Sequence, residues 1–211
     1  MSVFIAFYYR QTRLSHVKMN FMEKSKNIDP RVRIMEVAER LFYTEGVRGT
    51  GTEKIMSVSD VAKATFYRHF ESKDALVLAY LDRSAQAFWD YLATPAPPED
   101  VHEALIKIDR LANRPEVTGC PFLRVAAEYP DLAHPFHRRV IEQKDKLLAY
   151  LIALLKPFAI DRAVAATKLL IIIDGAMSLR MVYGASKEVP LLSSAEAILK
   201  SFPRARAQRR R

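Results

Sequence analysis

Polar and basic side chains are concentrated between residues 62 and 73 of the chain. They are Lys63, Thr65, Tyr67, Arg68, His69 and Lys73, and the small residues Ala62 and Ala64 lie among them. Lys and Arg neutralise phosphates, and Arg, Thr and Tyr also donate hydrogen bonds to phosphate oxygens or base edges. Residues 61–73 contain three basic side chains and one acidic side chain, a local charge of +2. This segment is therefore a candidate surface for nucleic acid.

Two short helices are expected to position these side chains. Between residues 51 and 70 the apolar side chains recur at helical spacing, and they can close a small core with a preceding helix. They are Ile55, Val58, Val61, Phe66 and Phe70. The side chains between them then form a polar face. This arrangement is typical of a helix-turn-helix, in which packing specifies the apolar positions and DNA specifies the exposed ones.

The helices on either side of residues 51–70 have clear start and stop signals. Asp29 followed by Pro30 predicts the start of a helix that runs to Gly46. Ser72 caps a longer helix that runs to Leu92. The proline-rich segment 94–98 then ends it, because the residue before a proline disfavours helical geometry.

Helices are also expected throughout the rest of the chain, without a strand pattern or a repeat. Proline, aspartate and glycine signals predict helices over residues 98–113, 119–129, from 135 to before Pro157, 161–183 and 194–201. The expected fold class is therefore all-α.

The formal net charge of +9 is concentrated in the two ends of the chain. Residues 1–28 carry +4 and residues 200–211 carry +6, so the rest of the chain carries −1. Basic tails add sequence-independent affinity for phosphates, but they do not locate a face that reads DNA. Met1, Met19 and Met22 are alternative start sites, because Met19 and Met22 both precede the first convincing helix.

The sequence favours a cytoplasmic protein without catalytic chemistry. Cys120 is the single cysteine, so no intramolecular disulfide can form, and no secretory signal is recognisable. The longest apolar run, 169–173, is shorter than the roughly 18 residues of a membrane span, so no membrane association is expected. No nucleophile elbow, phosphate loop or HExxH motif is visible, and Cys120, His134 and His137 match no zinc spacing. We therefore expect no enzyme, no cofactor and no metal.

Two segments, RIMEVAERLFYTEG and GTEKIMSVSDVAKATFYRHFESKDAL, resemble the first four helices of the tetracycline-repressor (TetR) family over roughly residues 30 to 82. The resemblance implies an N-terminal three-helix DNA-binding domain and a larger helical domain for ligand binding and dimerisation. It implies phosphate contacts from Thr50 or Thr52, Tyr67, His69 and Lys73, and base contacts from Lys63, Thr65 and Arg68, with Ala62 small enough to let the helix seat deeply. Asp60 replaces the usual turn glycine, and aspartate tolerates the left-handed conformation.

The resemblance also sets the expected domains and partners. The domains are an extension over 1–28, a DNA-binding domain over 29–82 with its motif at 51–70, an effector and dimerisation domain over 83–202, and a basic tail over 203–211. The expected partners are double-stranded operator DNA, a second copy of the chain and a small-molecule effector that releases a repressor from DNA. The helix over 72–92 joins the two domains and is the expected lever.

Two later segments, GCPFLRVAAEYPD at 119–131 and LLIIIDGAM at 169–177, also resemble family members. Effector pockets are mostly apolar with a few polar groups, which suggests the candidates Phe88, Trp89, His102, Phe122, Tyr129 and Phe136, although such aromatic residues are more often plain core. The apolar run 169–173 covers a helix on all sides. It therefore suggests either a helix buried in one monomer or a dimer interface with Leu170, Ile173, Gly175, Met177 and Met181.

Other functions remain open from the sequence alone. An all-helical enzyme, or a carrier of lipids or other ligands, would share only the shape of a regulator. A DNA-binding regulator controlled by a protein partner or by oxidation of Cys120 would keep the DNA site and lose the effector.

Overall fold

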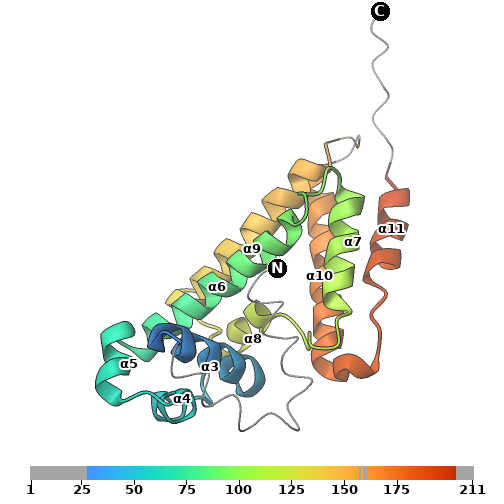
Figure 1. Ribbon diagram of the computed structural model, residues 1–211. Helices are drawn as coiled ribbons and strands as arrows, with labels where there is room; N and C mark the ends of the chain where they lie inside the picture. Colours follow the sequence, from blue (N-terminus) through green and yellow to red (C-terminus); the bar gives the residue numbers. More distant parts are fainter. Residues whose placement is uncertain (1–27, 157, 159–160, 203–211) are drawn as a thin grey trace, which may run out of the picture. The chain divides into compact units, whose positions relative to one another are not determined.

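The computed structural model describes residues 28–156, 158 and 161–202, and these residues are mainly helical (Figure 1). The α-helices are α3 (Pro30–Glu45), α4 (Thr52–Ser59), α5 (Lys63–His69), α6 (Lys73–Ala93), α7 (Val101–Ala112), α8 (Pro121–Glu128), α9 (Pro135–Leu154), α10 (Arg162–Tyr183) and α11 (Leu191–Lys200). A 3-10 turn, η1 (Gly184–Ser186), follows α10. No strand occurs within this described part, and the all-α prediction is confirmed.

The described chain divides into two compact units. The first extends to Trp89 and also includes Arg124–Val140, and the second comprises Asp90–Leu123 and the residues from Ile141 onwards. The division after Trp89 lies close to the proline-rich segment 94–98. The predicted domains are contiguous in sequence, whereas these units are not, because residues 124–140 pack with the N-terminal helices.

The first unit is built on α3. The side chain of Asp29 accepts a hydrogen bond from the N–H of Arg31 at 2.8 Å, which caps the helix as expected. At its other end, the N–H of Gly46 donates to the carbonyl of Phe42, and Gly46 has a φ of 83°. Helices α4 and α5 both pack against α3, with Ile34, Phe42, Ile55 and Phe66 buried among them.

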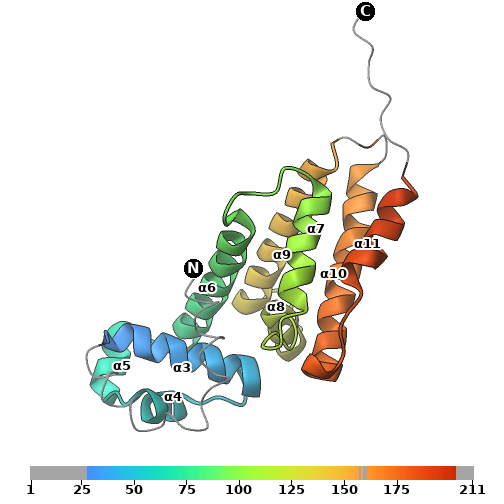
Figure 2. The ribbon, with the colours of Figure 1, turned by 45° about the vertical axis from the view of Figure 1, so that its right-hand side comes forward.

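Helices α7, α10 and α11 pack side by side in the second unit (Figure 2). Helix α7 begins at Val101 rather than Pro98, because Asp100 caps it by accepting from the N–H of Glu103 at 2.9 Å. Helix α11 begins at Leu191, three residues before the predicted start. The hydroxyl of Ser194 donates to the carbonyl of Pro190 at 2.7 Å, so Ser194 lies inside the first turn instead of before it.

A buried arginine holds the C-terminal end of α10. The guanidinium of Arg180 donates to the carbonyls of Arg114 at 2.7 Å, Val117 at 2.9 Å and Lys187 at 3.1 Å. Arg180 is 2% exposed, so these three bonds replace the water that its charge gives up. The same bonds tie α10 to the segments that precede α8 and α11.

Candidate nucleic-acid interface

The turn between α4 and α5 has the geometry of a helix-turn-helix. Asp60 adopts the left-handed conformation, with φ 51° and ψ 53°, and its N–H donates to the carbonyl of Ser57. The N–H of Val61 then donates to the carbonyl of Met56 at 3.2 Å, which closes the end of α4. The left-handed turn predicted at Asp60 is confirmed.

Two arginines of α3 hold the C-terminal ends of the two motif helices. Nη1 of Arg33 donates to the carbonyls of Ser59 at 3.1 Å and Asp60 at 3.2 Å, at the end of α4. Nη1 of Arg31 donates to the carbonyl of His69 at 3.3 Å, at the end of α5, and its guanidinium lies 4.8 Å from the ring centre of Phe70. Cations stabilise helix C-termini through the carbonyls that have no partner within the helix.

Sequence reasoning missed both arginines, although a signal was present. Arg31 and Arg33 lie in the first turn of α3, where the helix dipole disfavours a positive charge. Basic side chains at that position therefore indicate a stabilising contact elsewhere. Here the contact is with the ends of α4 and α5, so one helix sets the placement of both motif helices.

Helix α5 buries one face and exposes the other. Phe66 and Phe70 are buried, with their ring centres 6.4 Å apart, and Tyr67 packs edge-on against Phe66 at 5.2 Å. The opposite side exposes Ala62, Lys63, Ala64, Tyr67 and Arg68, while Thr65 and His69 are half-buried. The structure thus places the predicted DNA-contacting side chains of α5 on or beside one accessible polar face.

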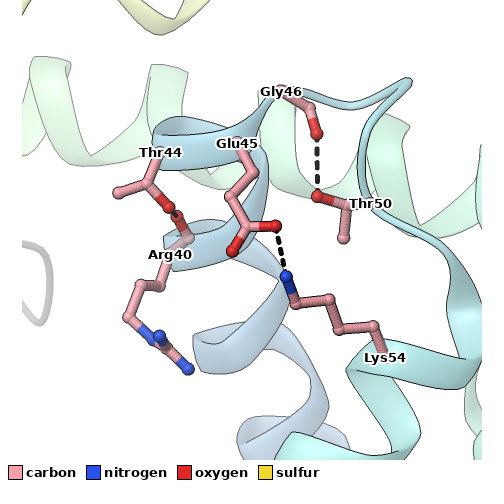
Figure 3. Close-up of polar contacts among 6 residues, drawn as sticks. All are labelled: Arg40, Thr44, Glu45, Gly46, Thr50 and Lys54. Carbon is pink, nitrogen blue, oxygen red and sulfur yellow. Dashed lines mark hydrogen bonds and ion pairs between the residues drawn. The ribbon is translucent and has the colours of Figure 1, made fainter.

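Of the two threonines expected to contact phosphate, only Thr52 has an accessible side chain. Thr50 is fully buried, and its hydroxyl donates to the carbonyl of Gly46 at 2.8 Å (Figure 3). Thr50 therefore stabilises the turn before α4, and its predicted phosphate contact is wrong for the side chain. Thr52 and Lys73 are half-buried, at the first residues of α4 and α6.

The predicted packing of Val58 is also wrong. Val58 is 45% exposed, whereas the neighbouring Ser59 is buried and donates its hydroxyl to the carbonyl of Ile55 at 2.7 Å. Because Ser59 satisfies its hydroxyl within its own helix, a polar residue can occupy the core position. Apolar type alone therefore misplaced the buried face of α4 by one residue.

A buried carboxyl group of α3 pairs with an arginine of α6. Oε1 of Glu39 lies 2.9 Å from Nε of Arg83, and Glu39 is 5% exposed. Burial raises the pKa of Glu39 to about 7, although the positive charge of Arg83 acts in the opposite direction. This pair carries no signal in the sequence, because a glutamate on a helix is normally solvated.

The candidate effector residues do not form one described cluster. In the first unit, Phe88 packs against Trp89 at 5.2 Å, and Tyr129 packs against Phe136 at 4.9 Å. Phe122 is buried in the second unit. His102 is exposed, and its Nε2 lies 2.8 Å from Oε1 of Glu196. This hydrogen bond at the surface disagrees with a place for His102 in an enclosed pocket, whereas the other five residues stay a prediction.

Helix α10 exposes an apolar stripe that the sequence analysis did not identify. Positions three, four or seven residues apart lie on one helix face. This face exposes Lys168 and Ser178, and its exposed apolar residues are Val164, Ile171, Gly175, Leu179 and Val182. We call these five residues the α10 stripe. Ile171 is 66% exposed and Val182 is 73% exposed. Gly175 belongs to the predicted dimer interface, and a Cβ there would meet no described atom within 4 Å.

Two of the predicted interface residues lie on the opposite face of α10. Ile173 and Met177 are 4% and 8% exposed within a single chain, which leaves little of either side chain for a second copy to contact. Leu170 is half-buried and Met181 is exposed, and neither belongs to the α10 stripe. The apolar run surrounds the helix, and therefore its sequence alone could not distinguish the two faces.

By length and composition, residues 162–186 would also suffice to cross a membrane. The core helix of a soluble protein passes the same test, and the opposite side of α10 packs against α7 and α11. The residues buried there are Ala165, Ala166, Leu169, Ile173, Ala176, Met177 and Arg180. Within the second unit, α10 therefore buries one face and exposes the other.

The surroundings of Cys120 do not favour a reactive thiol. Burial raises the pKa of the Cys120 thiol, and the nearby charge of Lys144 only partly opposes this effect. Lys144 forms an ion pair with Asp174, which links α9 to α10. Since the thiolate is the nucleophile, a raised pKa slows oxidation. Within the described residues, no group of three or more His, Cys, Asp or Glu side chains could hold a metal ion.

The arrangement of residues 30–82 matches known bacterial regulators. Residues 34–80 match the model of the bacterial regulatory proteins of the tetR family. A TetR-family transcriptional regulator from Streptomyces coelicolor is 32% identical, and the structural match covers 81% of this chain and 94% of that protein with a TM-score of 0.75.

Two sequence relatives are also similar to this chain. The transcriptional repressor NemR of Escherichia coli is 24% identical over 119 residues, which are 53% of this chain and 60% of NemR. The transcriptional regulator TtgR of Pseudomonas putida is 38% identical over 77 residues, 36% of each chain. The chain therefore spans less than two thirds of either sequence relative. Together with the structural match over 94% of a related regulator, the sequence and the fold show that this chain belongs to the TetR family.

Proposed function

We propose that the protein is a sequence-specific DNA-binding transcriptional repressor that a small-molecule effector releases from its operator. The main support is the exposed face of α5, where Lys63, Tyr67 and Arg68 extend from a helix anchored by buried Phe66 and Phe70. An α-helix with such a face fits the major groove of DNA. NemR, which resembles this chain, is named a transcriptional repressor.

The side chains of this face divide into two roles. Arg68, Lys63 and Thr65 are assigned to base edges, because Arg and Lys hydrogen bond to guanine and Thr can hydrogen bond to several bases. Phosphate contacts are assigned to Tyr67, His69, Lys73 and Thr52. Phosphate contacts fix the position of the protein on DNA, and base contacts then provide the sequence preference.

A second copy of the chain is the proposed partner for the α10 stripe. An exposed apolar stripe on a helix loses favourable burial unless another surface covers it. Gly175, at the centre of the stripe, permits close approach of a partner helix. A two-fold dimer would present two copies of α5 to two half-sites of an operator, which suits recognition of an inverted repeat.

Release from DNA follows from the relative stability of two conformations. The effector must bind the conformer with wrongly spaced recognition helices more tightly than the DNA-bound conformer. A preference of about 100-fold corresponds to a coupling free energy of about 2.7 kcal/mol. Helix α6 is the proposed lever, because it runs without interruption from residues of the first unit into residues of the second. The proposed compartment is the cytoplasm.

The DNA-binding function can be tested by selection from random DNA. The full chain should enrich a duplex with two related half-sites, and fluorescence anisotropy on that duplex should give the affinity. Arg68→Ala should weaken binding by about 10- to 100-fold, as expected for loss of a base contact. The control is Arg110→Ala, because Arg110 is an exposed arginine of α7. No enrichment of any sequence by the unmodified protein would contradict the proposal and favour an enzyme or a carrier.

A further inference from the structure

The last residue of α8 binds the turn that follows α3. Oε1 of Glu128 accepts a hydrogen bond from the N–H of Val47 at 3.0 Å, and Oε2 accepts one from the N–H of Arg48 at 2.6 Å. One carboxylate therefore binds two consecutive backbone amides from about 80 residues away in the sequence. Hydrogen bonds from N–H groups to an ionised carboxylate are stronger than those between neutral groups.

Neighbouring contacts hold Glu128 in this position. The guanidinium of Arg48 lies 4.9 Å from the ring centre of Tyr129, and that of Arg124 lies 5.1 Å from the ring centre of Tyr43. Arg124 of α8 thus contacts Tyr43 of α3, and Tyr129, directly after α8, contacts Arg48 in the turn after α3. All of these residues belong to the first unit.

A glycine makes room for the carboxylate. Gly46 has a φ of 83°, which side chains rarely adopt, and a Cβ there would lie 2.8 Å from Oε1 of Glu128. The positive φ of Gly46 turns the chain so that the next two amides both point at the carboxylate.

The turn held by Glu128 leads directly into α4. The carbonyl of Val47 accepts from the N–H of Thr50 at 3.3 Å, and Thr50 in turn donates its hydroxyl to Gly46. Lys54 of α4 pairs with Glu45, the residue before the turn, at 2.5 Å (Figure 3). Only Gly51 separates this bonded turn from Thr52, the first residue of α4.

We propose that Glu128 is a positioning residue for DNA binding, which acts from outside the helix-turn-helix by fixing the turn 46–48 and thereby the start of α4. The proposal rests on the proposed DNA-binding function. Glu128 itself makes no contact with DNA in this proposal. Through the turn, its carboxylate fixes the position of Thr52 and of the N-terminal amides of α4 relative to the DNA backbone when α5 occupies the major groove.

Glu128→Gln tests the proposal with little change in shape, because the amide has one acceptor oxygen and its NH₂ group repels one of the two N–H donors. Affinity is measured by fluorescence anisotropy on the duplex that the unmodified protein selects from random DNA. We expect Glu128→Gln to weaken binding by about 10-fold and to leave the slope of log affinity against log salt nearly unchanged, because Thr52 and the α4 amides carry no cation whose phosphate contact would release a counterion. The matched control is Glu188→Gln, which removes the same charge from an exposed site in the second unit and should change affinity by less than about twofold.

A second variant reaches the same contact from the turn. Gly46→Ala places a methyl group against the Glu128 carboxylate and should also weaken binding. The backbone strain at φ 83° is present whichever residue occupies position 128, so it cancels in a double-mutant cycle. The double variant Gly46→Ala with Glu128→Gln should therefore lose less affinity than the two single losses combined. Circular dichroism and amide exchange at Val47 and Arg48 report whether the helices persist and whether the two bonds are lost.

The outcomes separate this proposal from the proposed function. If the unmodified protein selects no sequence, both proposals are overturned. If it selects a duplex and Glu128→Gln binds that duplex as tightly while the amides of Val47 and Arg48 exchange faster, Glu128 has only a structural role and this proposal alone is overturned. Additive losses in the double-mutant cycle would equally contradict it.

Discussion

Helices α5 and α10 each expose one face, and the two faces differ in chemistry. The exposed side of α5 contains Lys63, Tyr67 and Arg68, whereas the exposed side of α10 contains Ile171 and Val182 among other apolar residues. A polar, positively charged face suits phosphates and base edges, and an apolar face suits another protein surface. The type of exposed side chain therefore favours a different kind of partner for each helix, nucleic acid for α5 and a protein surface for α10.

The largest expected effect follows from a charge placed on the exposed face of α10. Ile171→Asp places a charge in the α10 stripe, so we expect dimers to dissociate and affinity for a two-site operator to fall by roughly 1,000-fold, since one bound half-site no longer tethers the other. Analytical ultracentrifugation and fluorescence anisotropy measure the two effects. Ile141→Asp is the control, because Ile141 is 38% exposed on α9 and outside the stripe. A monomeric unmodified protein would contradict the prediction.

A buried acid should make the stability of the first unit depend on pH. The pKa of Glu39 is raised from 4.5 to about 7, so the folded state holds a proton that the unfolded state has already lost. The stabilising contribution is therefore fully present below about pH 4.5 and falls by up to about 3 kcal/mol as the pH rises to about 7. Glu39→Gln should remove most of this dependence.

Urea unfolding at several pH values between about 5 and 8 tests the role of Glu39, with fluorescence of Trp89, the single tryptophan, as the signal. Trp89 belongs to the first unit. Glu53→Gln serves as the control, because it removes a carboxylate from an exposed site of the first unit that is not among the causes of the Glu39 shift. An unfolding free energy with the same pH dependence in Glu39→Gln and in the unmodified protein would contradict the assignment.

The sequence predicted features whose signals are local. Asp29 with Pro30 marked the start of α3, and Asp161 with Gly184 marked both ends of α10, because caps act on the nearest turn. The polar face of α5 was also predictable, since Lys and Arg are rarely buried. Helix α11 was placed less well, because its first turn begins directly after Pro190 and the apolar pair that follows carries no capping side chain.

The sequence could not predict contacts between distant residues. Nothing near Glu128 indicates that its carboxylate binds the amides of Val47 and Arg48, because that contact depends on how the chain folds back. Thr50 illustrates the same limit, since a threonine before a helix is equally able to contact phosphate or to bond its own turn. In α10, both faces are apolar, and therefore only packing distinguishes Ile173 from Ile171.

The end of α4, which leads into the turn before α5, should depend on Arg33 of α3. Arg33→Ala removes two hydrogen bonds from a cation to the carbonyls of Ser59 and Asp60, so we expect a loss of about 1.5 kcal/mol in the free energy of unfolding. Operator affinity should fall about fivefold, because the end of α4 is released. Arg110→Ala is the control, and equal affinities and midpoints for both variants would contradict the prediction.

The smallest expected effect concerns the turn that joins α4 to α5. Asp60 is held at φ 51°, a conformation that costs an ordinary side chain about 1 kcal/mol and glycine almost nothing. Asp60→Gly should therefore raise the free energy of unfolding by about 0.5 kcal/mol, and Asp60→Ala should lower it by about 1 kcal/mol, with operator affinity changed less than twofold by the glycine. Thermal and urea unfolding measure both. Equal destabilisation by Asp60→Gly and Asp60→Ala would contradict this prediction. It would mean that a specific contact of the Asp60 side chain stabilises the turn, and that tolerance of the left-handed backbone does not explain the aspartate.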